Sequence, residues 1–105
     1  MFNVFSSPKT THPIPGRPRV LYICNPNTPT GSAVRRRELR DCLDRVPDEV
    51  RVIIDEVYID FADDPEVASG IEVAAGRGNV AVVRSLSKVY GLAGLRVGFA
   101  VTSPE

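Results

Sequence analysis

The residues best suited to chemistry follow an apolar run, Val80–Val83, which ends in two hydroxyl side chains and Lys88. Arg96 comes eight residues after this lysine, across a glycine-spaced segment. The chain has only one other lysine, Lys9, and arginine supplies the remaining positive charge. A lysine just beyond a buried strand is a candidate nucleophile toward aldehydes, because burial lowers a lysine pKa and frees the amine. The alternative is a solvated lysine at a strand end.

Two further polar clusters stand in similar places, directly after apolar runs. They are Asn25–Gly31 and Asp55–Tyr58, and Ser85–Lys88 is the third cluster of this kind. In open α/β sheets, ligands bind outside the carboxyl ends of the strands. One pocket would then hold an amide-and-proline turn, a carboxylate beside a phenol, two hydroxyls and a lysine, with Arg96 close behind.

This set of groups matches what the aldehyde cofactor pyridoxal 5'-phosphate requires. A lysine binds the aldehyde, a carboxylate keeps the pyridine nitrogen protonated, and hydroxyls with an arginine hold the phosphate. Each group also has a plainer interpretation. Asp55 and Glu56 could be a charge pair at a helix start, Arg96 a surface cation, and the serines turn formers. The ordered recurrence of the clusters favours the cofactor site.

The elements that must position these groups are short strands and one clear helix. Unbroken apolar runs fit strands covered on both faces of a parallel sheet, and four are expected: Arg19–Cys24, Val50–Ile54, Val80–Arg84 and Val97–Val101. A helix is predicted from Val34 to Val46, with Pro47 ending it, because Leu39, Cys42, Leu43 and Val46 share one face. A short second helix is expected within Val67–Ala75. The predicted fold class is α/β, a mainly parallel sheet with right-handed crossover helices.

The same stretches carry a family resemblance. Asn25-Pro26-Asn27-Thr28-Pro29-Thr30-Gly31, Asp55-Glu56-Val57-Tyr58, and Ser85-Leu86-Ser87-Lys88 with Gly91-Leu92-Ala93-Gly94-Leu95-Arg96-Val97-Gly98 resemble the large domain of class I/II, fold-type-I pyridoxal-phosphate aminotransferases. Within that group the segment is most similar to histidinol-phosphate aminotransferases, whose second motif often continues as Tyr58-Ile59-Asp60-Phe61 does here. The resemblance implies amino transfer between an amino acid and a 2-oxo acid or phosphorylated carbonyl substrate, in amino-acid and specifically histidine biosynthesis.

The resemblance assigns a role to each matching position. Lys88 would bind the cofactor aldehyde and later move the proton between the substrate α-carbon and the cofactor. Asp55 would pair with the pyridine nitrogen, and Tyr58 would donate a hydrogen bond to the ring's 3-oxygen.

The remaining implied roles concern the phosphate and the 3-oxygen. Ser85, Ser87 and Arg96 would hold the phosphate. The family usually has asparagine directly before Pro-Thr-Gly, where Thr28 stands here. Either Thr28 or its neighbour Asn27 would take over the contact to the 3-oxygen, or the contact would be lost and the tuning of the cofactor altered.

Composition limits the other possibilities. The 105 residues carry no net charge, which argues against nucleic-acid or membrane-surface partners. No apolar run is long enough to span a bilayer, and the start lacks a signal-like pattern, so a cytoplasmic location is expected. Cys24 and Cys42 are expected to be small buried hydrophobes rather than a disulfide or metal pair, and no metal site is predicted.

The domain prediction is an irregular leader over residues 1–18 and the central part of a pyridoxal-phosphate-binding large domain over 19–105, without the small C-terminal domain. The resemblance implies a homodimer in a full-length context, acting on a small-molecule amino donor and acceptor. Two alternatives stay open. One is a related threonine-phosphate decarboxylase-like enzyme, and the other is a truncated, non-catalytic fragment.

Overall fold

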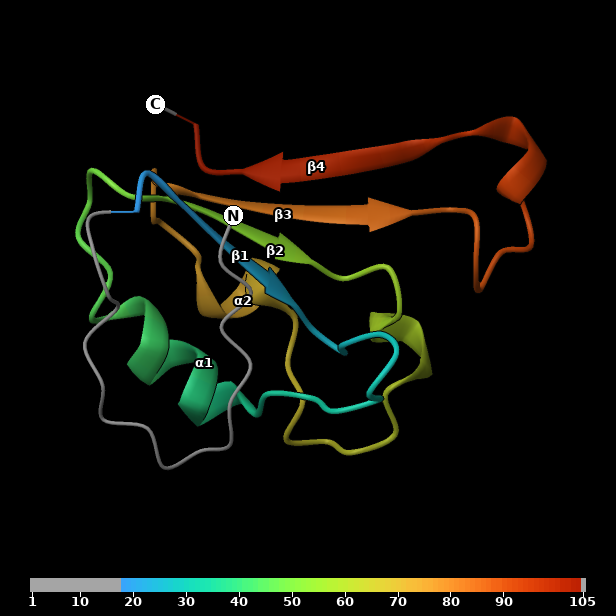
Figure 1. Ribbon diagram of the computed structural model, residues 1–105, viewed down its shortest axis with the longest axis horizontal. Coiled ribbons are helices and arrows are strands. Elements are labelled where there is room, and N and C mark those ends of the chain that lie inside the picture. Colours follow the sequence, from blue (N-terminus) through green and yellow to red (C-terminus); the bar gives the residue numbers. More distant parts are fainter. Residues whose placement is uncertain (1–17, 105) are drawn as a thin grey trace.

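The computed structural model describes residues 18–104, so almost all of the predicted leader lies outside the described residues. Within this range the chain forms four strands, two α-helices and two 3-10 turns (Figure 1). In chain order they are β1 (Val20–Cys24), α1 (Arg36–Leu43), β2 (Arg51–Asp55), η1 (Ile59–Phe61), α2 (Gly70–Val73), β3 (Val80–Ser85), η2 (Ala93–Leu95) and β4 (Gly98–Thr102).

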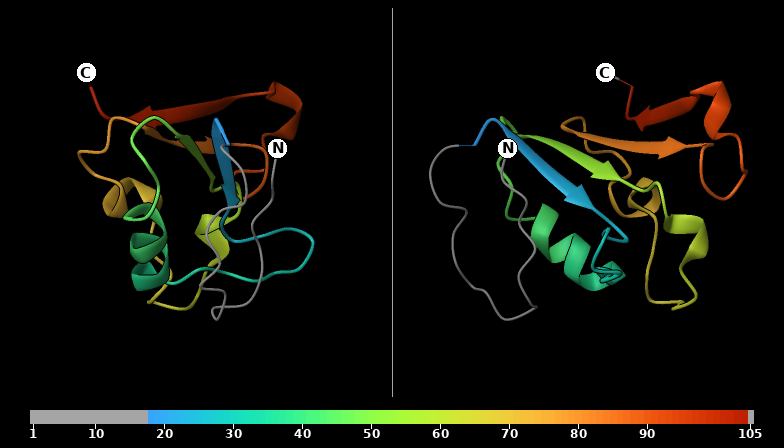
Figure 2. Two further views of the ribbon diagram at one scale, coloured as in Figure 1. Left: turned by 60° about the vertical axis from the view of Figure 1, so that its left-hand side comes forward. Right: turned by 45° about the vertical axis from the view of Figure 1, so that its right-hand side comes forward.

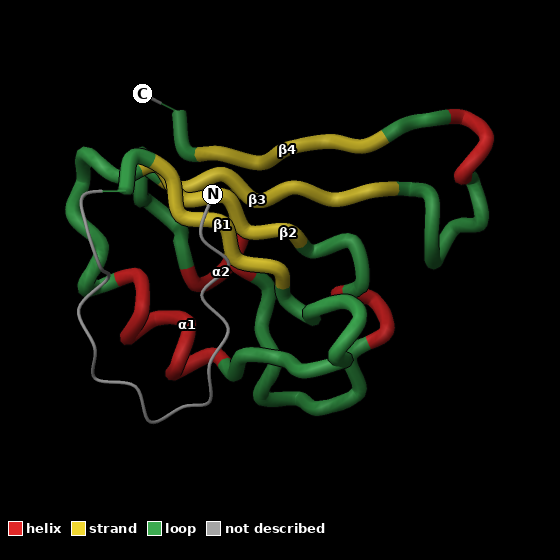
Figure 3. Tube along the Cα trace, viewed as in Figure 1, coloured by secondary structure: helices red, strands yellow, loops and turns green. Residues whose placement is uncertain are grey.

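The strands form a single sheet in the order β1-β2-β3-β4 (Figure 3). β1 pairs with β2 and β2 with β3 in parallel, whereas β4 runs antiparallel to β3. The predicted α/β class with a mainly parallel sheet is therefore confirmed. In the described sheet β1 and β4 are the two edge strands.

Both helices pack on one face of the sheet (Figure 2). Alternate strand residues point into this layer, so that Leu21, Val52 and Val82 are almost fully buried there. The helices contribute the buried side chains of Leu39, Leu43 and Val73. Within residues 18–104 no helix covers the opposite face, and most strand side chains on that face, such as Tyr22, Ile53 and Asp55, are only half-buried.

Helix α1 is shorter than the predicted Val34–Val46. At its start, Asn25 binds both backbone groups of Val34: the Val34 N–H donates to Oδ1 at 2.8 Å, and Nδ2 donates to the Val34 carbonyl at 3.2 Å. These bonds hold Val34 outside the helix. At its end, the amides of Arg45 and Val46 donate to carbonyls three residues back rather than four, so the helix closes in a tight turn before Pro47. Val46 is still buried in the core, as the helical spacing predicted.

Helix α2 is a single turn within the predicted Val67–Ala75. Ser69 is its N-cap, with Oγ accepting from the Ile71 amide at 3.1 Å. Gly70 at its first position lies close to β2: a Cβ there would be 2.8 Å from Ile54 Cδ1, so that side chain would have to shift. The strand bounds differ from prediction by a residue, and β2 extends to Asp55.

Both cysteines are free thiols, as predicted, although Cys42 is half-buried rather than fully buried. Burial raises the pKa of the Cys42 thiol, and the positive charge of Arg45 opposes this shift.

Candidate active site

The three polar clusters begin at the carboxyl ends of β1, β2 and β3, which lie at the same end of the sheet. The parallel register places Cys24 beside Asp55, and Asp55 beside Val83, so β1 and β2 end side by side and β3 continues to Ser85. The Asn25 amide donates to the Asp55 carbonyl at 2.8 Å, which joins the first cluster to the second. The strand ends therefore bring these clusters to one edge, as the sequence predicted.

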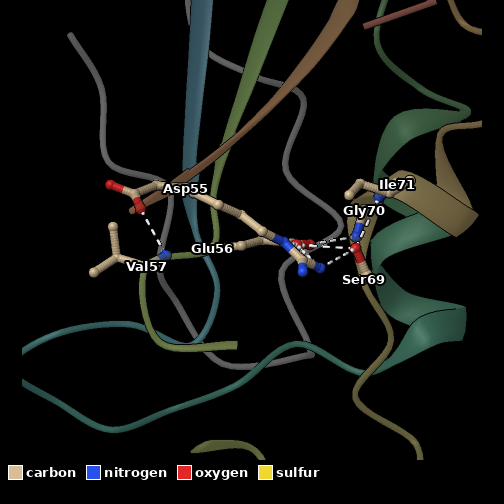
Figure 4. A network of polar contacts seen from close by, with 7 residues as sticks. Asp55, Glu56, Val57, Ser69, Gly70 and Ile71 are labelled. Atoms are coloured by element: carbon tan, nitrogen blue, oxygen red, sulfur yellow. Dashed lines mark hydrogen bonds and ion pairs between the residues drawn. The ribbon is translucent and has the colours of Figure 1, made fainter. Parts of the chain in front are cut away.

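Asp55 and Glu56 point to opposite sides of the sheet (Figure 4). Asp55 lies on the face without helices, where its Oδ1 accepts from the Val57 amide at 3.0 Å and its Oδ2 accepts from the Tyr22 hydroxyl. Each oxygen keeps a lone pair for a further donor. The alternative that Asp55 and Glu56 act together at a helix start is thus wrong for Asp55.

The sequence analysis did not identify Tyr22 as a site residue. Burial raises its pKa, and the hydrogen bond to Asp55 and the charge of that carboxylate raise it further, so the phenol stays protonated at neutral pH. A polar residue in an otherwise apolar strand was the available signal. Its partner depends on the register of β1 against β2, which the sequence does not state.

Glu56 points into the helix layer and is 1% exposed. Its Oε2 accepts from Arg84 Nε at 3.1 Å, from Arg84 Nη2 at 3.0 Å and from Ser69 Oγ at 2.9 Å, and its Oε1 accepts from the Gly70 amide (Figure 4). The carboxylate thus caps the start of α2 and ties it to β2 and β3. The alternative of a charge at a helix start thus fits Glu56, although the helix is α2 and not one that begins at Glu56 itself; sequence reasoning gave no role to Arg84.

Lys88 lies beside Tyr58. Its Nζ is 5.7 Å from the centroid of the Tyr58 ring, a cation–π distance. Lys88 is exposed, so the expectation of a buried amine is wrong for the described residues; the segment after β3 extends beyond the layer that would bury it. Within residues 18–104 the amine forms no ion pair, so it is accessible to a ligand.

Of the three predicted phosphate ligands, the two serines are hydrogen-bonded to each other, but within residues 18–104 Arg96 bonds to neither. Ser85 Oγ accepts from the Ser87 amide at 3.1 Å, which fits the alternative of a turn-forming serine. Arg96 is exposed, has a left-handed backbone with φ of 54°, and donates to the Ala93 carbonyl at 3.2 Å. In the described part of the chain no hydrogen bond links Arg96 to either serine, so the predicted roles of all three stay predictions.

The turn Asn25–Gly31 shares a hollow with Tyr58. Asn27 is buried and its Nδ2 donates to Thr30 Oγ1 at 2.7 Å, whereas Thr28 is exposed. Both line an open hollow of about 360 Å³ whose other wall includes Tyr58 and Phe61. Asp55, Lys88, the serines and Arg96 do not line it. The structure thus brings Asn27 and Thr28 to Tyr58, the other residue predicted to contact the 3-oxygen.

Comparison with known proteins decides the family. Residues 7–105 match the family described as "Aminotransferase class I and II". The chain belongs to this aminotransferase family. It is 56% identical over 88 residues to an aromatic amino acid aminotransferase of Streptomyces avermitilis, which covers 84% of this chain and 24% of the relative. The chain therefore spans about a quarter of the length of the curated relatives it matches.

Solved structures of an aminotransferase and of a decarboxylase share the fold. A histidinol-phosphate aminotransferase from Sinorhizobium meliloti, solved with pyridoxal-5'-phosphate, is 30% identical with a TM-score of 0.74; the match covers 80% of this chain and 23% of that one. An L-threonine-O-3-phosphate decarboxylase from Porphyromonas gingivalis is 31% identical with a TM-score of 0.69, over 80% and 25% of the two chains. The predicted family and fold type are confirmed, and so is the predicted cofactor of the family, pyridoxal 5'-phosphate.

The donor set of this aminotransferase segment fits pyridoxal 5'-phosphate in part. The Asp55 carboxylate has a free lone pair on each oxygen, and the Lys88 amine is accessible beside the Tyr58 phenol. These are the groups that a pyridine nitrogen, an aldehyde and a ring oxygen require.

Among residues 18–104 no helix combines the length and apolar character needed to cross a membrane.

Proposed function

We propose that this chain is the cofactor-binding segment of a pyridoxal-phosphate-dependent aminotransferase, which moves an amino group between an amino acid and a 2-oxo acid or phosphorylated carbonyl substrate. The observation that carries the proposal is that the Lys88 amine lies beside the Tyr58 ring. Tyr58 in turn follows Asp55 by three residues, at the end of β2. Family membership supports it independently.

Each proposed role follows from the chemistry of the side chain. The cofactor, when bound, supplies an aromatic ring that withdraws electrons from the substrate α-carbon. Asp55 holds the proton on the pyridine nitrogen, and Tyr58 donates to the 3-oxygen. Lys88 Nζ would hold the cofactor through its aldehyde carbon, with loss of water; once the substrate amine has displaced it, the freed Lys88 amine would take the proton from the α-carbon.

The remaining side chains hold the cofactor in place. Ser85, Ser87 and Arg96 bind the phosphate, which an arginine fork and hydroxyl donors suit. Asn27 or Thr28 supplies the second contact to the 3-oxygen. Binding would have to move the Arg96 side chain away from the Ala93 carbonyl, to which it donates in this structure.

For the substrate, we infer an aromatic amino acid as the amino donor. The inference is supported by the names of several curated relatives, which are aromatic amino acid aminotransferases. Histidinol phosphate, the substrate that the sequence resemblance favoured, is the second candidate, because a curated relative and several solved structures are named histidinol-phosphate aminotransferases. Parallel assays with phenylalanine and histidinol phosphate as donors distinguish them by kcat/KM.

The site is tested by trapping the cofactor on its lysine. The complete protein that carries this chain is mixed with pyridoxal 5'-phosphate, reduced with borohydride and mapped by mass spectrometry. The adduct is expected on Lys88 and absent from Lys88→Ala, while Lys9→Ala, which removes the chain's other lysine, retains it. An unchanged spectrum and adduct yield in Lys88→Ala contradict the proposal.

Decarboxylation is a second candidate reaction because the likeness to the threonine-phosphate decarboxylase is almost as close as that to the aminotransferase structure. Measuring carbon dioxide release beside amino transfer decides between them. A chain that traps the cofactor but performs neither reaction is the outcome expected of a non-catalytic fragment.

A further inference from the structure

Tyr22 contacts the carboxylate on which the proposed cofactor chemistry depends. Its hydroxyl donates to Oδ2 of Asp55, and the Val57 amide donates to Oδ1 at 3.0 Å. The two donors come from different strands and loops, and together they restrain both oxygens of one carboxyl group. No other side chain of residues 18–104 makes a hydrogen bond to Asp55.

The strand register explains how Tyr22 reaches this position. Cys24 is the direct neighbour of Asp55 across the parallel pair, and Tyr22, two residues earlier, points to the same side of the sheet as Asp55. A long tyrosine side chain spans this diagonal, which a shorter polar residue would not. The face is the one that the helices leave open, so the phenol does not serve the helix-side core.

The phenol acts as a donor at any pH near neutrality. Burial and the neighbouring Asp55 raise the pKa of Tyr22 above its ordinary value, so the hydroxyl keeps its proton. A neutral phenol that donates to a carboxylate stabilises the ionised carboxylate and fixes its plane. Each Asp55 oxygen still has acceptor capacity for a pyridine N–H.

We propose that Tyr22 is a positioning residue for Asp55, which orients the carboxylate toward the protonated ring nitrogen of pyridoxal 5'-phosphate. The inference rests on the proposed function. A purely structural tyrosine would affect every ligand of the site equally. A residue acting through Asp55 affects only ligands that have a ring nitrogen for Asp55 to hold.

The test compares two cofactors on the same protein preparation. Dissociation constants are measured for pyridoxal 5'-phosphate and for its 1-deaza analogue, in which a C–H replaces the ring nitrogen. The complete protein is compared with Tyr22→Phe, Asp55→Ala and the double variant. Tyr90→Phe is the matched control, because Tyr90 is 59% exposed and its hydroxyl makes no hydrogen bond within the described residues. The ratio of the two constants is independent of the fraction of folded protein.

The parent is expected to prefer the natural cofactor, and Tyr22→Phe to reduce this preference about tenfold, the effect of losing one charge-assisted hydrogen bond. Binding of the deaza analogue should not change, and Tyr22→Phe should have no further effect once Asp55 is alanine. If Tyr22→Phe weakens the binding of both cofactors equally, or keeps the parent's preference for pyridoxal 5'-phosphate, the role of Tyr22 is overturned and the proposed function is not. A parent that binds neither cofactor, or shows no preference, overturns the proposed function and this inference with it.

Discussion

At the scale of single residues, two adjacent carboxylates have separate environments. Asp55 lies on the open face and keeps acceptor capacity for a ligand, whereas Glu56 is buried and its oxygens accept from Arg84, Ser69 and Gly70. Alternation along an extended chain separates them. The sequence indicated Asp55 as a site residue, but the partners of Glu56 come from distant segments, so they could not be predicted.

Replacing Glu56 by glutamine should destabilise the protein. The substitution keeps the shape but removes the charge opposite Arg84, so an ion pair with one fully buried partner is broken. We expect the free energy of unfolding to fall by at least about 2 kcal/mol. Equilibrium unfolding in urea measures the change.

The control for this prediction is Glu72→Gln. Glu72 pairs with Arg36 at 3.0 Å, but both side chains are largely exposed, so the expected loss is below about 1 kcal/mol. Equal losses for the two variants would mean that burial of the Glu56 carboxylate has no energetic consequence.

At the scale of the elements, the sequence predicted the strands better than the helix ends. Each strand was recognised as an apolar run; burial accounts for β2 and the start of β3, whereas β4 is largely exposed. The start of α1 instead depends on the Asn25 side chain, which binds Val34 from nine residues away. Contacts of this kind are tertiary, so local helical spacing overestimated the helix. The Tyr22–Asp55 contact was missed for a similar reason, because it depends on strand register.

The pairing of β3 with β4 depends on a close approach at Gly98. A Cβ at this position would lie 2.7 Å from the Arg84 carbonyl oxygen, a backbone atom that cannot rotate away. We expect Gly98→Ala to lower the free energy of unfolding by about 1–3 kcal/mol, as overpacking does. Since Gly98 is the register partner of Ser85, hydrogen exchange of the β3–β4 amides should also accelerate.

Gly78→Ala is the matched control for Gly98→Ala. Nothing lies within 4 Å of a Cβ built at Gly78. Its unfolding free energy and amide exchange should match those of the parent. If Gly98→Ala behaves in the same way, the strands are free to separate and the close approach does not restrain them.

At the scale of the whole molecule, apolar side chains stay exposed in the segment that follows β3. Leu95 is 64% exposed and Phe99 48%, and Val89, Tyr90, Leu92 and Val97 are also exposed. This segment projects beyond the helix layer (Figure 1). β1 and β4 are also unpaired edges of the described sheet. Contiguous apolar surface and open strand edges both favour association.

We therefore expect the 105-residue chain, expressed by itself, to associate as its concentration rises. Sedimentation velocity at increasing concentration measures this, and Leu95→Glu should reduce the associated fraction because it places a charge in the exposed apolar segment. Arg37→Glu is the control, since Arg37 lies on the solvated face of α1, where its side chain is 92% exposed. A soluble monomer with a sharp melting transition would show that the open face and edges are compatible with an independent fold. Association that Leu95→Glu and Arg37→Glu reduce equally would instead assign the effect to net charge, because both variants make the chain more acidic.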